Sequence, residues 1–318
     1  MPKKIPDTDN IQLKPLFVER YKSLLGGEYD KFMEYSLSYL RKSIRINTLR
    51  ADVSEIKKRL ELQGFRLEQV PWCKEGFFIE HETGRRDIGC TLEHALGYYY
   101  VQEAASMIPP VVLDPKEDEV ILDMCASPGS KSTQLAQYMN NTGLLVSNDL
   151  TTKRIAPLSI NLQRCGSFNN IITIVHGAVF KRLSLEFDRI LVDAPCSGVG
   201  AIRKSLKTLL MWNPLMVKRL SGTQKALIES AFSKLKVGGT LVYSTCTLEP
   251  EENEGVISYL LNNHPDAQAV EIDLPLKRGK PVLEFAGEKY NPDVSKTLRL
   301  WPQDNDTEGF FVAKIRKK

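Results

Sequence analysis

The stretch Ile121-Leu-Asp-Met-Cys-Ala-Ser-Pro-Gly-Ser-Lys-Ser-Thr133 decides the fold of this 318-residue chain. It starts as an apolar run typical of a buried β-strand, and a turn of small residues then leads into a helical pattern. Small residues let a ligand approach the backbone, and the free N–H groups at a helix N-terminus attract an anionic group. The stretch therefore predicts a loop for a nucleotide or adenosyl cofactor, although a plain strand-to-helix turn has the same local pattern.

Strands and helices alternate after Pro109-Pro110. The expected elements are strand Val120–Met124, helix Lys131–Met139, strand Leu144–Asn148, helix Thr152–Cys165, strand Ile171–Val175, strand Phe187–Asp193, helix Pro214–Leu235 and strand Thr240–Ser244. This alternation predicts βαβ crossovers and a mostly parallel, doubly wound α/β sheet. Ligands of such sheets bind beyond the carboxyl ends of the strands, so we expect the functional site at that edge.

The region before this sheet has a different pattern. Apolar residues recur at helical spacing over 16–40, and the run Ser43–Leu49 alternates as a short strand. A further helical face over 53–60 ends at Gly64, and the basic triplet Lys57–Arg59 lies largely off that face, as solvated residues do. The chain is also longer than a typical domain of ~100–200 residues. We therefore expect a small N-terminal α/β unit over residues 1–110 and a catalytic domain over 111–318.

Composition limits the class of protein. With 42% hydrophobic and 26% charged residues the chain is typical of a globular protein, and its net charge of +4 is only a weak indication of an anionic partner. Six cysteines without a CxxC pair argue against a disulfide framework and against a zinc site, so we expect a reducing cytoplasm and no metal. No apolar run approaches ~18 residues, which predicts no membrane partner. The oligomeric state stays open, with a monomer favoured.

Asp149 ends the strand that follows the cofactor loop. A carboxylate at this place can accept hydrogen bonds from both ribose hydroxyls of an adenosine-type cofactor. The alternative is a helix N-cap for the segment from Thr152 onward. The loop itself is not a P-loop, because Gly129-Ser-Lys-Ser132 lacks the glycine that should precede it at the P-loop spacing.

Two further strands end in a cysteine. Phe187-Asp-Arg-Ile-Leu-Val-Asp-Ala-Pro-Cys-Ser-Gly198 places Cys196 after an acid and a proline, and Leu241-Val-Tyr-Ser-Thr-Cys-Thr247 ends in Cys246. A single cysteine is usually a small buried hydrophobic residue. Two at strand ends, on the edge that should carry the cofactor loop, instead indicate a reactive site.

These segments resemble the Sun/Fmu-type RNA cytosine-5 methyltransferases. The resemblance rests on Asp193-Ala-Pro-Cys-Ser-Gly198, Ser244-Thr-Cys-Thr247 and Asp123-Met-Cys-Ala-Ser-Pro-Gly-Ser-Lys131. Further blocks in the same order are Ser43-Ile-Arg-Ile-Asn-Thr48, Tyr100-Val-Gln-Glu-Ala-Ala-Ser-Met107, Pro250-Glu-Glu-Asn-Glu254 and Thr307-Glu-Gly-Phe-Phe-Val312. No single block is decisive, but their order along most of the chain is highly specific.

The resemblance implies a Rossmann-like methyltransferase sheet with a small RNA-recognition-like N-terminal subdomain, and S-adenosylmethionine as the methyl donor. It implies that Cys246 is the nucleophile, that Cys196 releases the product and that Asp193 assists as a general acid. The implied cofactor contacts are Cys125, Ala126, Ser127, Pro128, Gly129, Ser130, Lys131, Asp149, Arg154 and Asp193. The implied partner is RNA, and the blocks look closest to those of tRNA-modifying members.

The chain departs from the family pattern at two positions. Members usually carry Gly-Gly-Lys where this chain has Gly129-Ser-Lys131, so Ser130 would be strained if the turn needs a positive φ there. Members of the family usually carry an acidic residue near the adenine amino group. At the corresponding position this chain has Gly177, in Val175-His-Gly-Ala178. Either a backbone carbonyl contacts the adenine at that place or the affinity for the cofactor is lower.

Other functions are compatible with parts of the pattern. The substrate could be ribosomal RNA, or the chain could be a non-catalytic RNA-binding protein on a methyltransferase fold. DNA cytosine-5 methyltransferases also place Pro-Cys at a strand end, but they have no need of the second thiol in Thr245-Cys-Thr247. Gln102, Arg203 and Lys204 are candidates for RNA contact, and an equally good interpretation is that they are ordinary polar surface residues.

Overall fold

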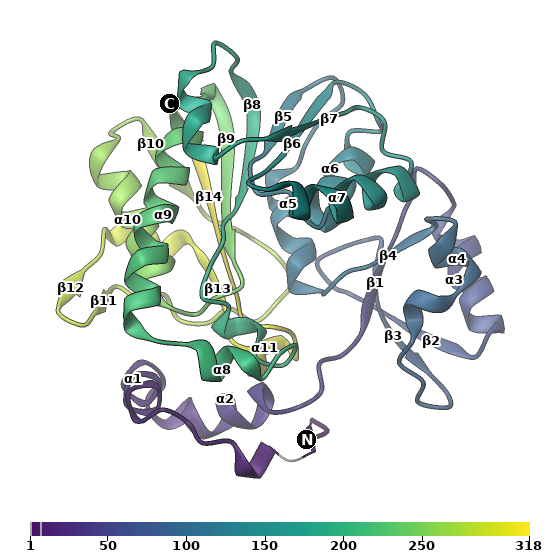
Figure 1. The fold of residues 1–318 in the computed structure, drawn as a ribbon, viewed down its shortest axis with the longest axis horizontal. Helices are drawn as coiled ribbons and strands as arrows, with labels where there is room; N and C mark the ends of the chain where they lie inside the picture. The colour runs from purple at the N-terminus through teal and green to yellow at the C-terminus, as the bar shows by residue number, and fades with distance from the viewer. Residues whose placement is uncertain (1, 7) are drawn as a thin grey trace.

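The computed structural model describes residues 2–6 and 8–318, and its centre is an eight-stranded sheet (Figure 1). The strand order is β10-β14-β9-β8-β5-β6-β7, with β13 paired to β14. The strands are β5 (Val120–Asp123), β6 (Leu144–Asp149), β7 (Asn170–Ile174), β8 (Phe187–Asp193), β9 (Leu235–Thr245), β10 (Ala267–Val270), β13 (Leu298–Leu300) and β14 (Phe310–Lys317). Neighbours from β7 to β9 are parallel, and β14 runs antiparallel to β9, β10 and β13.

Helices cover both faces of this sheet. On one side lie α5 (Ile108–Leu113), α6 (Ser130–Tyr138) and α7 (Thr152–Cys165), and on the other lie α9 (Pro214–Ser233) and α10 (Glu254–Asn263) (Figure 1). Successive strand residues alternate between the two cores: Ile121 packs in the core with α5 and α6, whereas Leu122 packs in the core with α9. The expected α/β class and doubly wound sheet are confirmed.

The chain reverses its direction of travel across the sheet at β5. From β5 it moves outward through β6 to β7, and it then returns to β8 on the other side of β5. Adjacent parallel strands whose connections diverge in this way leave a crevice beyond their carboxyl ends. The cofactor loop follows β5 and the Pro-Cys segment follows β8, so both open onto this crevice.

The N-terminal part forms a second, antiparallel sheet in the order β2-β3-β1-β4. Its strands are β1 (Ser43–Ile46), β2 (Phe65–Gln69), β3 (Gly76–His81) and β4 (Tyr99–Val101), accompanied by α3 (Val53–Leu62) and α4 (Leu92–Ala95). Arg45 in β1 is fully buried and joins this sheet to α6, where it donates hydrogen bonds to Thr133 Oγ1 at 2.8 Å and to Gln137 Oε1. The two parts of the chain therefore share a polar as well as an apolar contact.

The segment before β1 is helical but belongs to neither sheet. Here α1 (Pro15–Leu25) and α2 (Tyr29–Ser36) are separated at Gly26, whose φ of 54° is left-handed. Phe17 packs edge-on against Trp212, which follows α8 (Lys207–Met211), with 5.3 Å between ring centroids. The single helical run expected over 16–40 is thus two helices, and they cover the catalytic part rather than the N-terminal sheet.

Most expected elements of the catalytic part are present within one or two residues, and the differences have physical causes. Leu235 begins β9 instead of ending the preceding helix, because it pairs with Phe187 across a register shift. The C-terminal strands are not among the expected elements, and β14 carries most of the basic end of the chain. The remaining short elements are α11 (Pro302–Asn305) and the hairpin β11 (Glu284–Phe285) to β12 (Glu288–Lys289). None of the described helices combines the length and apolarity that crossing a membrane requires.

Candidate active site

The cofactor loop runs from the end of β5 to the start of α6. Its turn closes with a hydrogen bond of 2.8 Å from the Gly129 N–H to the Ala126 carbonyl, and the Ser127–Pro128 peptide bond is cis. Gly129 has φ of 104°, and a Cβ there would lie 3.2 Å from Leu158 Cδ1, so this position favours glycine. Ser130 is the first residue of α6 and its φ is not positive. The strain considered for Ser130 is therefore absent, because Gly129 alone takes the left-handed conformation.

Asp149 ties the end of β6 to this loop. Its Oδ2 accepts a hydrogen bond of 2.9 Å from the Ser127 N–H, and its Oδ1 accepts bonds of 2.7 Å from the Leu150 N–H and 2.6 Å from Arg154 Nε. Arg154 also donates to the Ser127 carbonyl at 3.0 Å. The helix after Thr151 has no side-chain cap from Asp149, so the N-cap alternative is wrong. Asp149 instead shapes the loop that follows the neighbouring strand.

Lys131 and Asp193 form an ion pair across the crevice. Lys131 Nζ lies 2.6 Å from Asp193 Oδ2, and Ser244 Oγ donates a hydrogen bond of 2.8 Å to Asp193 Oδ1. The pair joins the start of α6 to the ends of β8 and β9. Asp193 therefore lies between the cofactor loop and the two cysteine segments, and its side chain is 27% exposed, which leaves it accessible to a ligand.

Asp123, at the end of β5, is a functional candidate to which the sequence interpretation gave no role. Its Oδ2 accepts a hydrogen bond of 2.7 Å from Ser132 Oγ, but no donor among the described residues reaches its buried Oδ1. Burial, opposed by the Ser132 hydrogen bond and supported by the nearby charge of Asp193, raises the pKa of Asp123 to about 7. A buried oxygen without a partner is costly unless a ligand supplies the donor. A cationic ligand such as an ammonium or sulfonium fits this cluster of carboxylates.

Gly177 does not occupy the place at which an acidic side chain would reach the crevice. It is buried, and a Cβ at Gly177 would lie 2.5 Å from Leu227 Cδ2 and 2.9 Å from Met124 Cγ. Its carbonyl accepts a hydrogen bond of 2.9 Å from Ser230 Oγ, so the carbonyl is directed toward α9. Val175 and His176, which follow β7, both have exposed side chains. Of the two alternatives, the contact between the Gly177 carbonyl and the adenine is not supported by the geometry.

The two thiols lie side by side at the ends of β8 and β9. Cys196 Sγ and Cys246 Sγ are 3.3 Å apart, which is within hydrogen-bonding distance for sulfur. The hydrogen bond to Cys246, together with burial and the nearby negative charges, raises the pKa of Cys196 well above its ordinary value. Cys196 is thus held as a protonated thiol beside Cys246.

Side chains of the segment after β9 hold the two cysteine loops together. Glu252 Oε2 accepts hydrogen bonds of 3.0 Å from the Ser197 N–H and 2.7 Å from Gln224 Nε2. Gln224 also donates to the Pro195 carbonyl at 2.8 Å, and Ser197 Oγ lies 2.7 Å from Thr247 Oγ1. Glu252 belongs to one of the family-like sequence blocks, but its role could not be recognised without the fold, because its partners are distant in the sequence.

The three residues considered for RNA contact separate into two groups. Gln102 is buried and accepts a hydrogen bond of 2.8 Å from Arg45 Nε, and Arg203 is buried and donates to the Thr307 and Tyr39 carbonyls. Both therefore have structural roles, and neither is an ordinary surface residue. The Lys204 side chain is 57% exposed and pairs with Glu308 at 2.8 Å.

Residues 2–6 and 8–318 contain no group of three metal-binding side chains.

Comparisons with known proteins agree with this geometry. Residues 110–316 match the family model described as 16S rRNA methyltransferase RsmB/F, and residues 13–104 match the N-terminal domain of 16S rRNA methyltransferase RsmF. A tRNA (cytosine(49)-C(5))-methyltransferase of Pyrococcus abyssi is 50% identical over 301 residues, which are 94% of this chain and 95% of that protein.

Two further relatives extend the comparison. A ribosomal RNA small subunit methyltransferase F of Shewanella oneidensis is 42% identical over 96% of this chain, which spans only 64% of that longer protein. The crystal structure of a methyltransferase homologue from Pyrococcus horikoshii has a TM-score of 0.86 and 39% identity, and the match covers 96% of this chain and 95% of that one. The chain belongs to the RsmB/F family of RNA methyltransferases.

Proposed function

We propose that this protein transfers a methyl group from S-adenosylmethionine to C5 of a cytosine in RNA by a covalent mechanism that uses two cysteines. The observation that carries the proposal is the 3.3 Å contact between Cys196 and Cys246 at the crevice that also holds the cofactor loop. We infer that the RNA is a tRNA, because the Pyrococcus abyssi relative with that name matches this chain over 95% of its own length.

Residues of the crevice fit the proposed cofactor. Residues 125–131 provide the backbone around it, and Asp149 with Arg154 stands where the ribose would bind. Asp123 Oδ1 would accept a hydrogen bond from the ammonium of its methionine part, and Asp193 contributes negative charge near a sulfonium. When bound, the cofactor supplies an electrophilic methyl group. The surrounding carboxylates favour a positively charged ligand over a neutral one.

Cytosine C5 is too electron-poor to attack a methyl group directly, so the protein must activate the ring. The Cys246 thiolate adds to C6 and leaves C5 enamine-like and nucleophilic. The hydrogen bond from Cys196 stabilises that thiolate before the attack. Attack at C6 builds negative charge at the ring, and Asp193, as the general acid, gives a proton to N3 to neutralise it. Lys131, 2.6 Å from Asp193, stabilises the carboxylate that remains.

Product release needs a base that removes the C5 proton, so that the bond between Cys246 and C6 can break. Cys196 is the proposed base, and the attack itself prepares it for this role. The largest cause of its raised pKa is the hydrogen bond to Cys246, and the Cys246 charge adds to it. Once Cys246 is bonded to carbon, that acceptor and that charge are lost, so the pKa of Cys196 falls and its thiol gives its proton to solvent. The Cys196 thiolate then takes the C5 proton, Cys246 leaves as a thiolate, and the N3 proton returns to Asp193.

The two parts of the chain have separate tasks in this proposal. Residues 111–318 carry the cofactor loop and both thiols, and residues 1–110 contribute contacts to the RNA. A base inside a duplex cannot reach such a crevice, so the target cytosine must be unstacked or flipped. The six cysteines are free thiols, which suits a reducing cytoplasm.

The test is methyl transfer from tritium-labelled S-adenosylmethionine to a tRNA transcript, to 16S ribosomal RNA and to duplex DNA. We expect labelling of the tRNA, and bisulfite sequencing of the product should place the label at a cytosine C5. Labelling of ribosomal RNA instead would favour the activity in the name of the longer relatives, and labelling of DNA would favour a DNA enzyme. Cofactor binding without transfer to any of the three would indicate a non-catalytic RNA-binding protein.

A further inference from the structure

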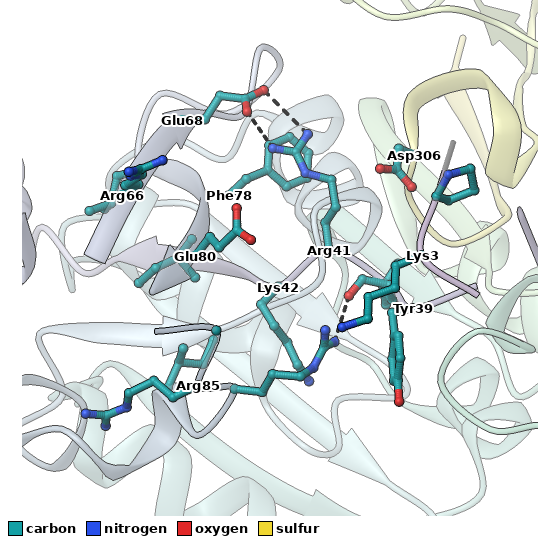
Figure 2. A pocket seen from close by; sticks show the side chains of 17 residues that line it. Lys3, Tyr39, Arg41, Lys42, Arg66, Glu68, Phe78, Glu80, Arg85 and Asp306 are labelled. Carbon is teal, nitrogen blue, oxygen red and sulfur yellow. Dashed lines mark hydrogen bonds and ion pairs between the residues drawn. The ribbon is translucent and has the colours of Figure 1, made fainter. Parts of the chain in front are cut away.

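A groove with excess positive charge runs across the junction of the two sheets. Its outer part is a cavity of about 400 Å³, and its inner part is a cavity of about 470 Å³. The two cavities share the segment Tyr39–Lys42 and Arg86, so they form one continuous feature, which we call the basic groove. Figure 2 shows the outer part, with Lys42 and Arg85 reaching into it from different segments.

Some cations of the basic groove are already neutralised. Arg41 forms an ion pair with Glu68 at 2.5 Å, and this pair lies at the groove wall (Figure 2). Asp306 forms an ion pair of 2.7 Å with the buried Arg203. Two further acids line the groove, Glu80 in the outer cavity and Glu103 in the inner cavity, and they are fewer than the cations that remain.

Among the described residues, four cations that line the groove form no ion pair with a carboxylate, namely Lys3, Lys42, Arg66 and Arg86. Lys42 and Arg86 are the two of these that line both cavities. Within the described part of the chain, neither has an acidic oxygen within ion-pair distance of 4.0 Å. The pKa of Lys42 is lowered, first by partial burial and then by the positive charges of Arg86 and Lys204. Cations that face one another in a groove are unfavourable for the free protein. Their arrangement becomes favourable when an anion binds between them.

Arg86 is held in place for such contacts. Its guanidinium lies 4.8 Å from the centre of the Tyr39 ring and donates one hydrogen bond of 3.0 Å to the Leu40 carbonyl. A guanidinium has five N–H donors in a planar fork, so most of its donors stay free for a phosphate. The ring and the carbonyl reduce the conformational entropy that Arg86 would lose on binding.

The inner end of the basic groove leads toward the thiols. Lys204 lines the inner cavity and follows the turn Val199–Ala201, in which the Gly200 N–H donates a hydrogen bond of 2.9 Å to the Cys246 carbonyl. The main acid at this end is Glu103, and burial together with Glu308 raises its pKa to about 7, so it carries only part of a negative charge. The inner cavity therefore lies close to the segment that carries Cys246, where a target base would react.

We propose that the basic groove binds the sugar–phosphate backbone of the RNA strand beside the target cytosine, with Lys42 and Arg86 in contact with a phosphate. The identity of this polyanion rests on the proposed function. Each phosphate contact to single-stranded RNA releases counterions, so binding should weaken with salt by a slope of about 0.7 per contact.

The experiment compares the dissociation constant of a fluorescently labelled tRNA transcript over a range of salt concentrations. Lys42→Ala and Arg86→Ala should each weaken binding about fourfold at 0.15 M salt and reduce the salt slope by about 0.7. Lys42→Arg should retain most of the affinity, because it keeps the charge. Lys58→Ala is the matched control, since Lys58 is exposed on α3 and lines neither cavity.

An unchanged salt slope in Lys42→Ala and Arg86→Ala would overturn the proposal. So would weaker binding with the wild-type slope, since that pattern indicates distorted structure and not a lost phosphate contact. In methylation assays, Lys42→Ala should raise KM for RNA and leave kcat nearly unchanged. The wild-type protein could bind RNA with a salt slope that falls by about 0.7 in each variant, and yet transfer no methyl group to any RNA. In that case the proposed function fails and the assignment of the basic groove stands.

Discussion

Cys196 Sγ lies 3.3 Å from Cys246 Sγ, although the two residues are 50 positions apart in the chain. They end adjacent parallel strands, β8 and β9, whose register places Asp193 beside Ser244. Across this contact the hydrogen bond to Cys246 raises the pKa of Cys196. In the proposed cycle the two thiols have separate tasks.

The first prediction separates these tasks. Cys246→Ala should abolish both methylation and any covalent protein–RNA species, because it removes the attacking thiolate. Cys196→Ala should still attack and methylate once, and should then stall as an adduct, because the C5 proton has no base. Denaturing gel electrophoresis with labelled RNA measures the adduct.

The double variant is the control for this prediction, and it should show no adduct. If Cys246→Ala traps the adduct instead, the Pro-Cys thiol is the nucleophile. If neither single variant forms an adduct and both remain active, the mechanism is not covalent.

The second prediction concerns Asp149. Asp149→Ala removes the proposed ribose contact and the acceptor of the Ser127 N–H and Arg154. We expect the dissociation constant for S-adenosylmethionine, measured by calorimetry, to rise by roughly tenfold or more, which corresponds to about 1.4 kcal/mol. Asp273→Ala, at an exposed acid, should bind as the wild type does. Equal constants for both variants would refute the role of Asp149.

The third prediction is that the free energy of unfolding depends on pH because Glu252 titrates. Burial raises the pKa of Glu252 to about 7, so the folded protein holds a proton that the unfolded chain loses near its ordinary pKa of 4.5. The folded state therefore binds more protons in this range, and the free energy of unfolding falls as the pH rises toward 7. The Glu252 contribution to this fall should be about 2 kcal/mol between about pH 5.5 and pH 8.

Glu252→Gln removes this titration and keeps an oxygen that accepts from the Ser197 N–H. Urea denaturation at the two pH values should therefore show a smaller loss of stability in the variant. Asp123 and Glu103 also have raised pKa values, but they titrate in both proteins and cancel in the comparison. An equal loss in the variant and the wild type would mean that Glu252 does not titrate in this range.

The fourth prediction concerns the joint between the two sheets. Arg45→Met leaves the Thr133 and Gln102 side chains without their hydrogen-bond partner in a buried place. We expect a loss of about 2 to 5 kcal/mol in the free energy of unfolding, because buried polar groups without partners are costly. Arg59→Met, at an exposed position of α3, should change stability by less than about 0.5 kcal/mol. Similar melting curves for the two variants would rule out a structural role for Arg45.

The sequence by itself determined the parallel half of the sheet and the placement of the cysteines. Helix Thr152–Cys165 and strand Phe187–Asp193 are read correctly because hydrophobic periodicity is a local property of the chain. Each cysteine follows a buried strand, and strands of one parallel sheet end at one edge. The pattern therefore places Cys196 and Cys246 at the same edge of the sheet, and the pairing of β8 with β9 in the structure brings them into contact.

Tertiary structure alone decided the features that depend on distant partners. Strand β14 pairs with β9 from 65 or more positions away, and the basic composition of its end resembles a solvated tail. Gln102 and Arg203 look like surface residues in the sequence, yet each is buried because its partners come from other segments. Lys42 and Arg86 are 44 positions apart, and they line the same cavity only once the N-terminal part of the chain is folded. Local pattern shows which faces are apolar, and only the packed chain shows which polar groups meet.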